Sequence, residues 1–405
     1  PTDEFIPSFT KKIFKKVEQL YTWKKKIAII GAGISGLFFA NLIKQNSKYD
    51  FTIYEKNSSL NLSDGYGVQL SVNSASILNE IGFKNFKKDN KFNPKKIDFY
   101  SLKNNNKICE LDLTQFNRKD INYTTLKRSL LIEFLKENLF TDSIQFNQKI
   151  EKIDYPNSKI EITFKNNTTE IFDYLVVADG VFSSMKSILF NTNIRPKYSG
   201  AIAVRALIKK EKLKFLNREN ISLFFGSKIH LVAYVVNIKN EFNLVAIIRK
   251  SLNRENLTNN KENLRQFIKD LELQKNSKFN KLFDNAEDIK CFPTFVSDKI
   301  RKFNKKNTFF IGDALYATLP AFAQGTSQSI ESAYELFNSL NENNINKYFN
   351  NRVERIKMVN RRSKLNYFIF HLSNPFFVFI RNLILKAVVN NKSFLSKYLG
   401  KIYNY

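Results

Sequence analysis

Short apolar runs and longer amphipathic segments alternate along this 405-residue chain. Residues 26–30 form an Ile-rich run that predicts a buried strand, residues 37–44 follow with a helical pattern, and residues 51–54 predict a second strand. Towards the other end of the chain, the apolar run 308–312 precedes a loop and a helical segment. Strands that alternate with helices in this way predict a parallel sheet in an α/β domain.

A second pattern, rich in β-branched and aromatic residues, fills the middle of the chain. Residues 198–250 contain several such segments, and residues 97–125 alternate loosely between apolar and polar positions, so both stretches predict strands. Residues 260–285 are highly charged and predict a helix. Because no repeat or low-complexity linker separates these stretches from the strand–helix segments, we expect two intertwined domains rather than two successive ones.

Both ends of the chain predict helices. Residues 1–25 place apolar side chains at helical spacing between lysines, and they lack the continuous apolar segment of a signal peptide. Residues 341–405 hold 12 basic and 2 acidic side chains, and their apolar run 367–380 is shorter than the ~18–20 residues that span a membrane. For each end two interpretations stay open: a helix that covers the domain, or a helix that lies on an anionic membrane surface.

Lysine and arginine outnumber the acidic residues by 65 to 37, which gives a formal net charge of +28. This charge is consistent with an anionic substrate or membrane, or with a compositional bias toward lysine. Because the basic residues are spread along the chain without a nucleic-acid-binding motif, we expect no nucleic-acid partner. Two cysteines and two histidines favour neither a disulfide framework nor a metal site. We therefore expect no metal and a cytoplasmic location, with peripheral membrane contact as the alternative.

The first strand–helix–strand unit carries the G-x-G-x-x-G spacing at Gly31, Gly33 and Gly36. In a dinucleotide site the first glycine permits the tight turn, the second lets the backbone approach the pyrophosphate, and the third lets helix and strand pack closely. The free N–H groups at the helix N-terminus then bind phosphate oxygens. Glu55 follows Gly36 by nineteen residues, where a carboxylate accepts hydrogen bonds from a ribose. Together these positions predict a dinucleotide site.

Three further glycine-bearing stretches follow in order, at residues 65–73, 179–183 and 312–331. With the first motif they resemble the FAD-dependent aromatic hydroxylases, the p-hydroxybenzoate-hydroxylase-like single-component flavoprotein monooxygenases, over most of residues 26–340. The stretch PAFAQGTSQSIESA is most similar to the salicylate and 3-hydroxybenzoate 6-hydroxylase branch. Four residues depart from the family pattern: Lys186 replaces an arginine, Tyr316 a histidine, Ser327 an asparagine and Ser332 an aspartate.

The resemblance implies an α/β fold in which an FAD-binding Rossmann-like domain of the GR2 type is interleaved with a β-sheet substrate domain, followed by C-terminal helices. The FAD-binding domain is therefore expected to be discontinuous in sequence. We assign an N-terminal helix to 1–25, the FAD-binding domain to 26–100, 126–195 and 300–340, the substrate domain to 101–125 and 196–299, and a helical region to 341–405.

The resemblance also implies tightly bound FAD, with NADH or NADPH as a transient reductant. Reduced FAD would react with O₂ to give a flavin hydroperoxide that hydroxylates a small phenolic or aromatic carboxylate substrate. The chain carries no second G-x-G-x-x-G unit for a separate nicotinamide domain. Two alternatives stay open: a membrane-associated hydroxylase of a prenylated phenol, as in quinone biosynthesis, and a catalytically altered flavin-binding or scaffold protein. We expect a monomer or a homodimer.

The family's motifs place candidate site residues in this chain. The expected cofactor-binding residues are Gly31, Gly33, Ser35, Gly36, Glu55, Lys56, Arg128, Asp179, Asp313, Gly325 and Thr326. The expected catalytic residues are His230, Tyr234, Pro320 and Tyr316. Pro320 would shape the wall over the flavin, and Arg205 and Gln69 are candidates for contact with the substrate or NAD(P)H.

His230 and Tyr234 are four residues apart in a predicted strand, so both side chains point to the same face. A phenolic substrate has to be at least partly deprotonated before it is attacked, and His or Tyr can relay that proton. In the 3-hydroxybenzoate 6-hydroxylase branch a corresponding H-x-x-x-Y pair faces the substrate. The alternative is that both rings are core residues of the sheet.

Overall fold

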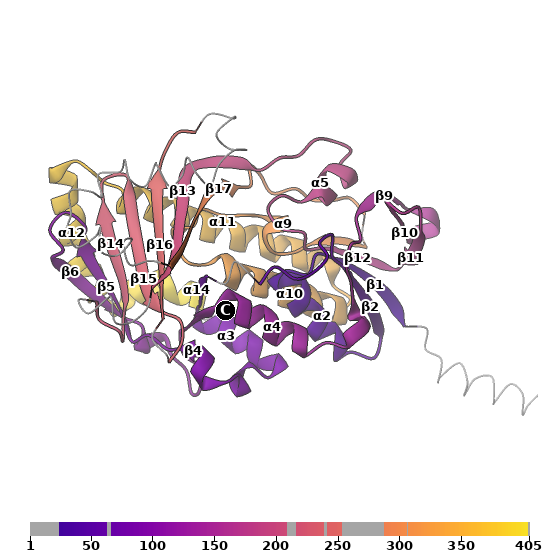
Figure 1. Ribbon diagram of the computed structural model, residues 1–405, viewed down its shortest axis with the longest axis horizontal. Helices are drawn as coiled ribbons and strands as arrows, with labels where there is room; N and C mark the ends of the chain where they lie inside the picture. Colours follow the sequence, from indigo (N-terminus) through magenta and orange to yellow (C-terminus); the bar gives the residue numbers. More distant parts are fainter. Residues whose placement is uncertain are drawn as a thin grey trace, which may run out of the picture.

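The computed structural model of the protein describes residues 24–62, 66–208, 216–238, 241–252, 287–305 and 307–403. Two expected helices lie outside the described residues: the charged helix of residues 260–285, and the N-terminal helix of residues 1–25 apart from its last two positions. The described parts form a large sheet, on the left of Figure 1, and a smaller parallel sheet on the right.

The parallel sheet has five strands in the order β18–β12–β1–β2–β8. These strands are Thr308–Phe310, Tyr174–Val177, Lys25–Ile30, Tyr49–Tyr54 and Ile144–Gln145. The helix α2 (Ile34–Lys44) connects β1 to β2. Ten of its eleven residues are buried, because the sheet, α4 (Arg128–Glu137) and α10 (Gly325–Asn341) enclose it. This unit confirms the expected Rossmann-like strand–helix–strand order.

Two small antiparallel sheets and three short helices extend this core. The meander β9–β10–β11 (Ile150–Asp154, Ile160–Phe164, Thr169–Phe172) packs two phenylalanine rings against Tyr54 of β2. The other small sheet contains β3 (Gly67–Leu70), β7 (Thr124–Lys127) and β4 (Lys91–Phe92). Strands β3, β12 and β18 lead into α3 (Val72–Leu78), α5 (Ser184–Leu189) and α9 (Gly312–Leu315), respectively.

The large sheet has seven strands in the order β17–β13–β16–β15–β14–β5–β6 and is antiparallel except where β14 pairs with β5. These strands are Glu287–Val296, Lys197–Ile208, Phe242–Arg249, Ile229–Val235, Ile221–Gly226, Lys96–Ser101 and Lys107–Asp112. The structure corrects the expected division at residue 100, because residues 97–100 pair with β14 in this sheet. A strand's sequence carries no mark of the sheet it joins, so this pairing could not be predicted locally.

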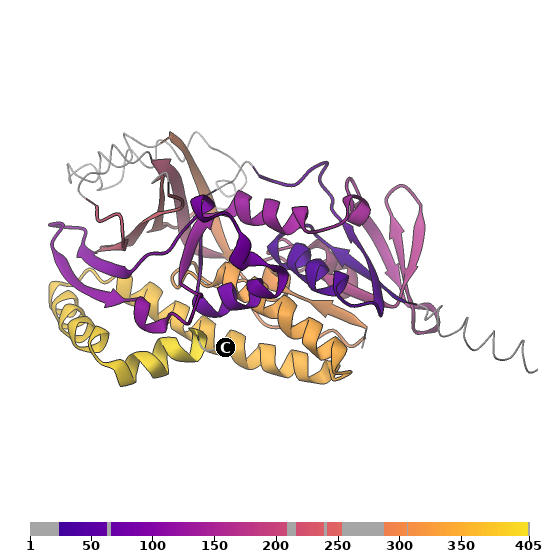
Figure 2. The same cartoon turned by 90° about the horizontal axis from the view of Figure 1, so that it is seen from below.

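The described chain ends in four α-helices: α11 (Ile345–Phe370), α12 (Pro375–Val389), α13 (Lys392–Leu395) and α14 (Lys401–Tyr403). Figure 2 shows them along the underside of the molecule, with α12 at the outer end beside β6. They confirm the expected C-terminal helices. In the part of the chain that the structure describes, no helix combines the length and the apolar character that crossing a membrane requires.

Candidate active site

A cleft of about 450 Å³ opens where β1, β2 and β12 reach the carboxyl edge of the parallel sheet. Ligands of open α/β sheets bind at this edge. Six of the expected cofactor-binding residues lie in the wall of the cleft: Gly31, Gly33, Glu55, Lys56, Arg128 and Asp179. The segments that follow β2 and β8, together with the start of α5, complete the wall.

The turn between β1 and α2 requires glycine at two positions. Gly31 has a φ of +107°, and a Cβ atom there would lie 2.5 Å from the carbonyl oxygen of Ala178. A Cβ atom on Gly36 would lie 2.1 Å from the carbonyl oxygen of Gly31. Gly33 differs, because a Cβ atom there would meet no other atom within 4 Å. The backbone therefore leaves open space at the helix N-terminus, where a phosphate can approach.

Glu55 joins the end of β2 to this turn. Its Oε2 accepts a hydrogen bond from the Ala32 N–H at 3.0 Å, and its Oε1 accepts one from the Asn57 N–H at 3.0 Å. The carboxylate is thereby held at the cleft wall. Ser35, also expected in the cofactor site, is buried in the first turn of α2 and packs closely against Gly312 of α9.

The N-terminus of α10 carries an unpaired buried amide. Gln324 immediately precedes the first turn, which begins with Gly325 and Thr326. Its side chain is only 3% exposed, and neither of its amide atoms has a hydrogen-bond partner among the described residues. Because buried polar groups are almost always paired, this amide indicates where a polar ligand fits. Gln324 was not among the site residues expected from the sequence, although it lies in the glycine-bearing stretch 312–331.

Charged side chains from three elements influence one another beside the cleft. Asp313 on α9 is partly exposed to solvent. The surrounding protein nevertheless desolvates its carboxyl group and raises its pKa to about 6, although the positive charges of Lys186 and Arg128 act to lower that pKa. Burial lowers the pKa of Lys186, and the charges of Asp179 and Asp313 oppose that shift. Burial likewise raises the pKa of Asp179. Position 186, where the family has arginine, therefore still provides a basic group beside two acids.

Three polar side chains on α11 hold the loop between α9 and α10. The pairs are Asn360 Nδ2 to Tyr316 Oη at 3.1 Å, Ser363 Oγ to the Leu319 carbonyl at 2.6 Å, and Asn366 Nδ2 to the Ala321 carbonyl at 3.3 Å. Pro320 therefore lies between two anchored residues. The expected flavin-site roles of Tyr316 and Pro320 stay predictions. The sequence analysis missed the three donors, although they recur every three residues, which places them on one side of a helix.

One row of the large sheet remains partly open. Arg205 on β13, Val245 on β16 and Val232 on β15 are direct neighbours across three adjacent strands, and all three are half-buried. On the same face the neighbours Ala203, Ile247, His230, Asn243 and Tyr234 are buried, whereas Leu207 is half-buried. The row is therefore more accessible than the positions that flank it on β15 and β16.

Positive charge borders one end of this row. Arg205 pairs across the sheet with Lys290 of β17, and both cations face the Tyr66 ring, at 6.0 Å from the guanidinium and 5.8 Å from the ammonium. Gly67, which follows Tyr66, donates its N–H to Asn243 Oδ1 at 2.7 Å and so holds the start of β3 against the sheet. The row therefore has a cationic, aromatic end at Arg205.

Gln69 connects two buried tyrosines near the row. Its Oε1 accepts a hydrogen bond from Tyr123 Oη at 2.8 Å, and its side chain also forms a hydrogen bond with Tyr234. Burial raises the pKa of Tyr234, whereas the charge of Arg205 and the hydrogen bond to Gln69 lower it. Tyr234, Gln69 and Tyr123 thus form a chain of polar groups. Tyr123 had not been selected from the sequence.

His230 lies on the same face as Tyr234, as expected, but its ring contacts a residue that the sequence analysis did not consider. His230 Nδ1 is 2.9 Å from His371 Nε2 at the end of α11, and Phe370 packs edge-on against the His230 ring. Both histidines are almost completely buried. The ring of His230 is therefore engaged with the C-terminal helices.

Comparison with known proteins gives consistent relatives over nearly the whole chain. The NAD(P)-binding Rossmann-like domain family matches residues 29–63. The chain is 23% identical over 369 residues to 6-hydroxynicotinate 3-monooxygenase of Pseudomonas fluorescens, with 87% of this chain and 94% of that protein covered. It is 24% identical over 364 residues to the 3-amino-4-hydroxybenzoate 2-monooxygenase PtnB3 of Streptomyces platensis, with 87% and 90% covered.

Among solved structures, the fold is similar to that of Klebsiella pneumoniae HpxO in complex with FAD and uric acid. The TM-score is 0.79 at 16% identity, over 93% of this chain and 97% of that chain. The chain is thus similar over most of its length to proteins named as monooxygenases of aromatic substrates. This similarity confirms the resemblance drawn from the four glycine-bearing stretches, and with it the expected α/β fold and enzyme class.

Two departures of this chain from the expected family pattern are accommodated by hydrogen bonds. Ser327 Oγ lies 3.0 Å from Ser71 Oγ and 2.9 Å from Ser74 Oγ, so it joins α10 to α3. Ser332 Oγ accepts a hydrogen bond from the Gly312 N–H at 2.8 Å, so it holds the turn that leads into α9. Both serines are buried and polar contacts satisfy them, which keeps α10 in place without the usual side chains.

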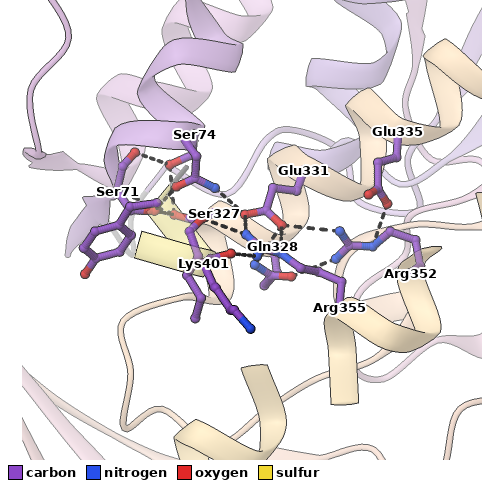
Figure 3. A network of polar contacts seen from close by, with 12 residues as sticks. Ser71, Ser74, Ser327, Gln328, Glu331, Glu335, Arg352, Arg355 and Lys401 are labelled. Atoms are coloured by element: carbon purple, nitrogen blue, oxygen red, sulfur yellow. Dashed lines mark hydrogen bonds and ion pairs between the residues drawn. The ribbon is translucent and has the colours of Figure 1, made fainter. Parts of the chain in front are cut away.

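A buried ionic network anchors α10 to the C-terminal helices (Figure 3). Arg355 donates hydrogen bonds to both carboxylate oxygens of Glu331, at 2.7 and 2.8 Å. Arg352 lies between two carboxylates, with its Nη1 3.4 Å from Glu331 and its Nε 3.2 Å from Glu335. Arg355 also donates to the Lys401 carbonyl at 2.7 Å. The side chains of both arginines and of Glu331 are almost fully buried. The end of the chain is thereby tied to the helix whose N-terminus borders the site.

The paired histidines make the stability of the folded protein depend on pH. Burial lowers the pKa of His371 to about 4, reinforced by the charge of Arg249, and burial lowers the pKa of His230 well below its ordinary value. In the unfolded chain both histidines titrate near pH ~6.5, so the unfolded state takes up protons first as the pH falls. We therefore expect His371 to decrease the free energy of unfolding by about 3 kcal/mol as the pH falls from about 6.5 to about 4.

Urea unfolding at a series of pH values measures this slope. The His371→Gln variant removes one of the two titrating groups and serves as the comparison, so its curve should be flatter over the same interval. Equal slopes in the two proteins would show that His371 takes up its proton at the same pH in the folded and unfolded states and would contradict the buried neutral pair.

Proposed function

We propose that this protein binds FAD in the cleft at the edge of the parallel sheet and that it hydroxylates a small aromatic carboxylate. NADH or NADPH would be the reductant of this reaction, and O₂ the oxidant. One observation carries this proposal: the cleft wall combines the glycine turn, the Glu55 carboxylate and the basic side chains of Lys56 and Arg128. These are the groups that a dinucleotide's phosphates and ribose require.

The residues present fit FAD from end to end. The pyrophosphate would rest on the N–H groups at the start of α2, beside the open space at Gly33. Glu55 would accept hydrogen bonds from the adenosine ribose, and Asp313 from the ribitol hydroxyl groups. The unpaired amide of Gln324 would bind the polar edge of the flavin ring.

Bound FAD, once reduced, supplies the transfer of one oxygen atom from O₂ to the aromatic ring. The chain's own residues provide the environment for that transfer. The N–H groups of Gly325 and Thr326 at the start of α10 stabilise negative charge placed against them. Pro320, on the loop that α11 anchors, closes the wall over the flavin and excludes water.

The substrate would lie over the half-buried row of Arg205, Val245 and Val232. The guanidinium of Arg205 would bind the substrate carboxylate, since an arginine fork matches a carboxylate with two hydrogen bonds. Both relatives' names specify ring substrates that carry a carboxylate and a hydroxyl group: 6-hydroxynicotinate and 3-amino-4-hydroxybenzoate. The valines would pack against the ring itself.

The proton of a phenolic substrate needs an acceptor at this site. Hydrogen bonds join Tyr123, Gln69 and Tyr234 and hold the Tyr234 hydroxyl group in place, and a tyrosine hydroxyl can pass on a substrate proton. We therefore keep Tyr234 as the proton relay. His230 is better assigned to packing, because its ring pairs with His371 at the end of α11.

Steady-state oxidation of NADH and NADPH by the purified holoprotein tests the proposed activity. Aromatic carboxylates with a ring hydroxyl should stimulate the oxidation, and mass spectrometry should find a product that has gained one oxygen atom from isotopically labelled O₂. A protein that holds FAD but neither oxidises a reduced nicotinamide nor forms product would support the flavin-binding scaffold instead.

Arg205→Gln should raise KM for an aromatic carboxylate by about 10- to 100-fold, because it removes a charge-assisted pair with the substrate. FAD content and the unfolding temperature should stay unchanged, since Arg205 lies on the large sheet and outside the cleft wall. Arg195→Gln removes an exposed arginine outside the sheet and is the matched control. An unchanged KM in Arg205→Gln, measured with the same substrate, would place the carboxylate elsewhere.

A further inference from the structure

The outer face of α12 exposes an apolar surface at the edge of the molecule (Figure 1). Five of its side chains are more than half exposed, and we call them the α12 patch: Phe376, Phe377, Phe379, Leu383 and Ile384. Of the twelve large apolar side chains that are exposed in the described parts of the chain, eight lie between Leu365 and Phe394. Because soluble proteins rarely gather exposed apolar side chains in this way, the patch indicates an interaction surface.

The orientation of α12 is fixed by its inner face. Arg381 is buried there, with its guanidinium 4.6 Å from the Phe225 ring centroid and a hydrogen bond of 3.4 Å to the Ile369 carbonyl. At the start of the helix, Asn374 Oδ1 accepts the Phe376 N–H at 3.0 Å. Because these contacts hold the inner face on the large sheet, the α12 patch points away from the protein.

The helices α12, α13 and α14 carry basic side chains and no acidic ones. No acidic residue follows Glu354 in the sequence, whereas residues 355–405 contain ten lysines and arginines. Lys364 on α11, Lys386 on α12 and Lys392 on α13 are all exposed. The neighbouring strand β6 does carry acidic side chains, of which Glu110 is paired with two lysines. An apolar surface on helices whose charged side chains are all basic is complementary to a surface that is apolar within and anionic at its boundary.

We propose that the α12 patch binds an anionic lipid bilayer, with α12 lying in the plane of the membrane interface. The fifteen residues of α12 are fewer than the ~20 that cross a bilayer, so the helix lies on the membrane rather than through it. The phenylalanine and leucine side chains enter the boundary of the acyl chains, while the lysines remain at the anionic headgroups.

A second copy of the chain fits the patch less well than a lipid surface does. A two-fold dimer brings the same surface of both subunits together. Two sets of helices whose charged side chains are all basic would then face each other, and like charges in contact oppose association. A bilayer that contains anionic lipids supplies the opposite charge.

Flotation of the full-length holoprotein with lipid vesicles tests this proposal without any use of enzyme activity. The protein should float with phosphatidylcholine vesicles that contain about 30% phosphatidylserine, and added salt should weaken the binding. The combined variant Phe376→Ser, Phe379→Ser, Leu383→Ser removes three outward apolar groups and should reduce the bound fraction by about tenfold or more. Its unfolding temperature and FAD content should match those of the unmodified protein, because all three side chains face away from the core.

Ile171→Ser is the matched control, since Ile171 is 54% exposed on β11 at the opposite end of the molecule (Figure 1). Its binding to vesicles should equal that of the unmodified protein. Failure of the unmodified protein to float with anionic vesicles, or undiminished flotation of the combined variant, would overturn the proposal. A dimer in sedimentation that the combined variant converts to a monomer would assign the patch to a second copy instead.

Discussion

Gly36→Ala will prevent accumulation of the folded protein, whereas Gly33→Ala will fold and lose its affinity for FAD. The first substitution places a Cβ atom 2.1 Å from the carbonyl oxygen of Gly31, and neither backbone segment can move without separating α2 from β1. We expect a loss of more than about 3 kcal/mol in the free energy of unfolding. The second substitution adds a methyl group where no protein atom lies within 4 Å.

The Gly33 substitution reports on the ligand because the space that it fills belongs to the cleft. Its effect on the unfolding of the protein without FAD should remain within about 1 kcal/mol, the cost of replacing glycine at a helix N-cap. Titration with FAD should show an affinity at least about 100-fold lower, equivalent to about 3 kcal/mol. Unaltered FAD affinity in Gly33→Ala would mean that the pyrophosphate does not approach α2 at this residue.

Glu331→Gln will cause the second large effect, a loss of about 3–5 kcal/mol in the free energy of unfolding. The variant removes the negative charge between Arg352 and Arg355 while the two guanidinium groups stay buried. Glu335 is then the only carboxylate left in the network, and it contacts Arg352 alone. A buried charge without its partner cannot recover its lost hydration, which is why breaking such a pair costs more than an exposed pair is worth.

Urea unfolding of Glu331→Gln, followed by circular dichroism, measures this loss. Glu342→Gln is the matched control, because Glu342 forms an exposed ion pair with Lys347 at 3.0 Å, and such pairs contribute about 1 kcal/mol or less. Similar stability losses in the two variants would contradict a network closed to water. Replacing both Glu331 and Arg355 by apolar residues should recover part of the loss.

The sequence predicted those parts of the site that depend on local backbone geometry. Gly31 and Gly36 are required by a turn of a few residues, so their spacing identified the turn before the structure was known. Glu55 was located in the same way, because it ends the strand that follows α2. The four glycine-bearing stretches then indicated the family, since this protein uses glycine sparingly and the order of the stretches is specific.

The parts that the sequence could not provide depend on contacts between distant segments. His371 lies 141 residues from His230, and no local pattern links the two. The hydrogen bonds from α11 to the loop at Pro320 also join segments that are far apart in the sequence. The same is true of the pairing of β5 with β14. Gln324 could have been found within its own stretch, because it precedes the helix whose N-terminus was already expected at the flavin.

The identity of the ligand bound to the purified protein is the most direct test of whether the cleft binds FAD. We expect a yellow protein with a flavin absorption spectrum, from which denaturation releases FAD in an amount close to one molecule per chain. Release of a different nucleotide, or a colourless folded protein that does not take up added FAD, would contradict a cleft built for the dinucleotide of FAD and would remove the basis of the proposed hydroxylation.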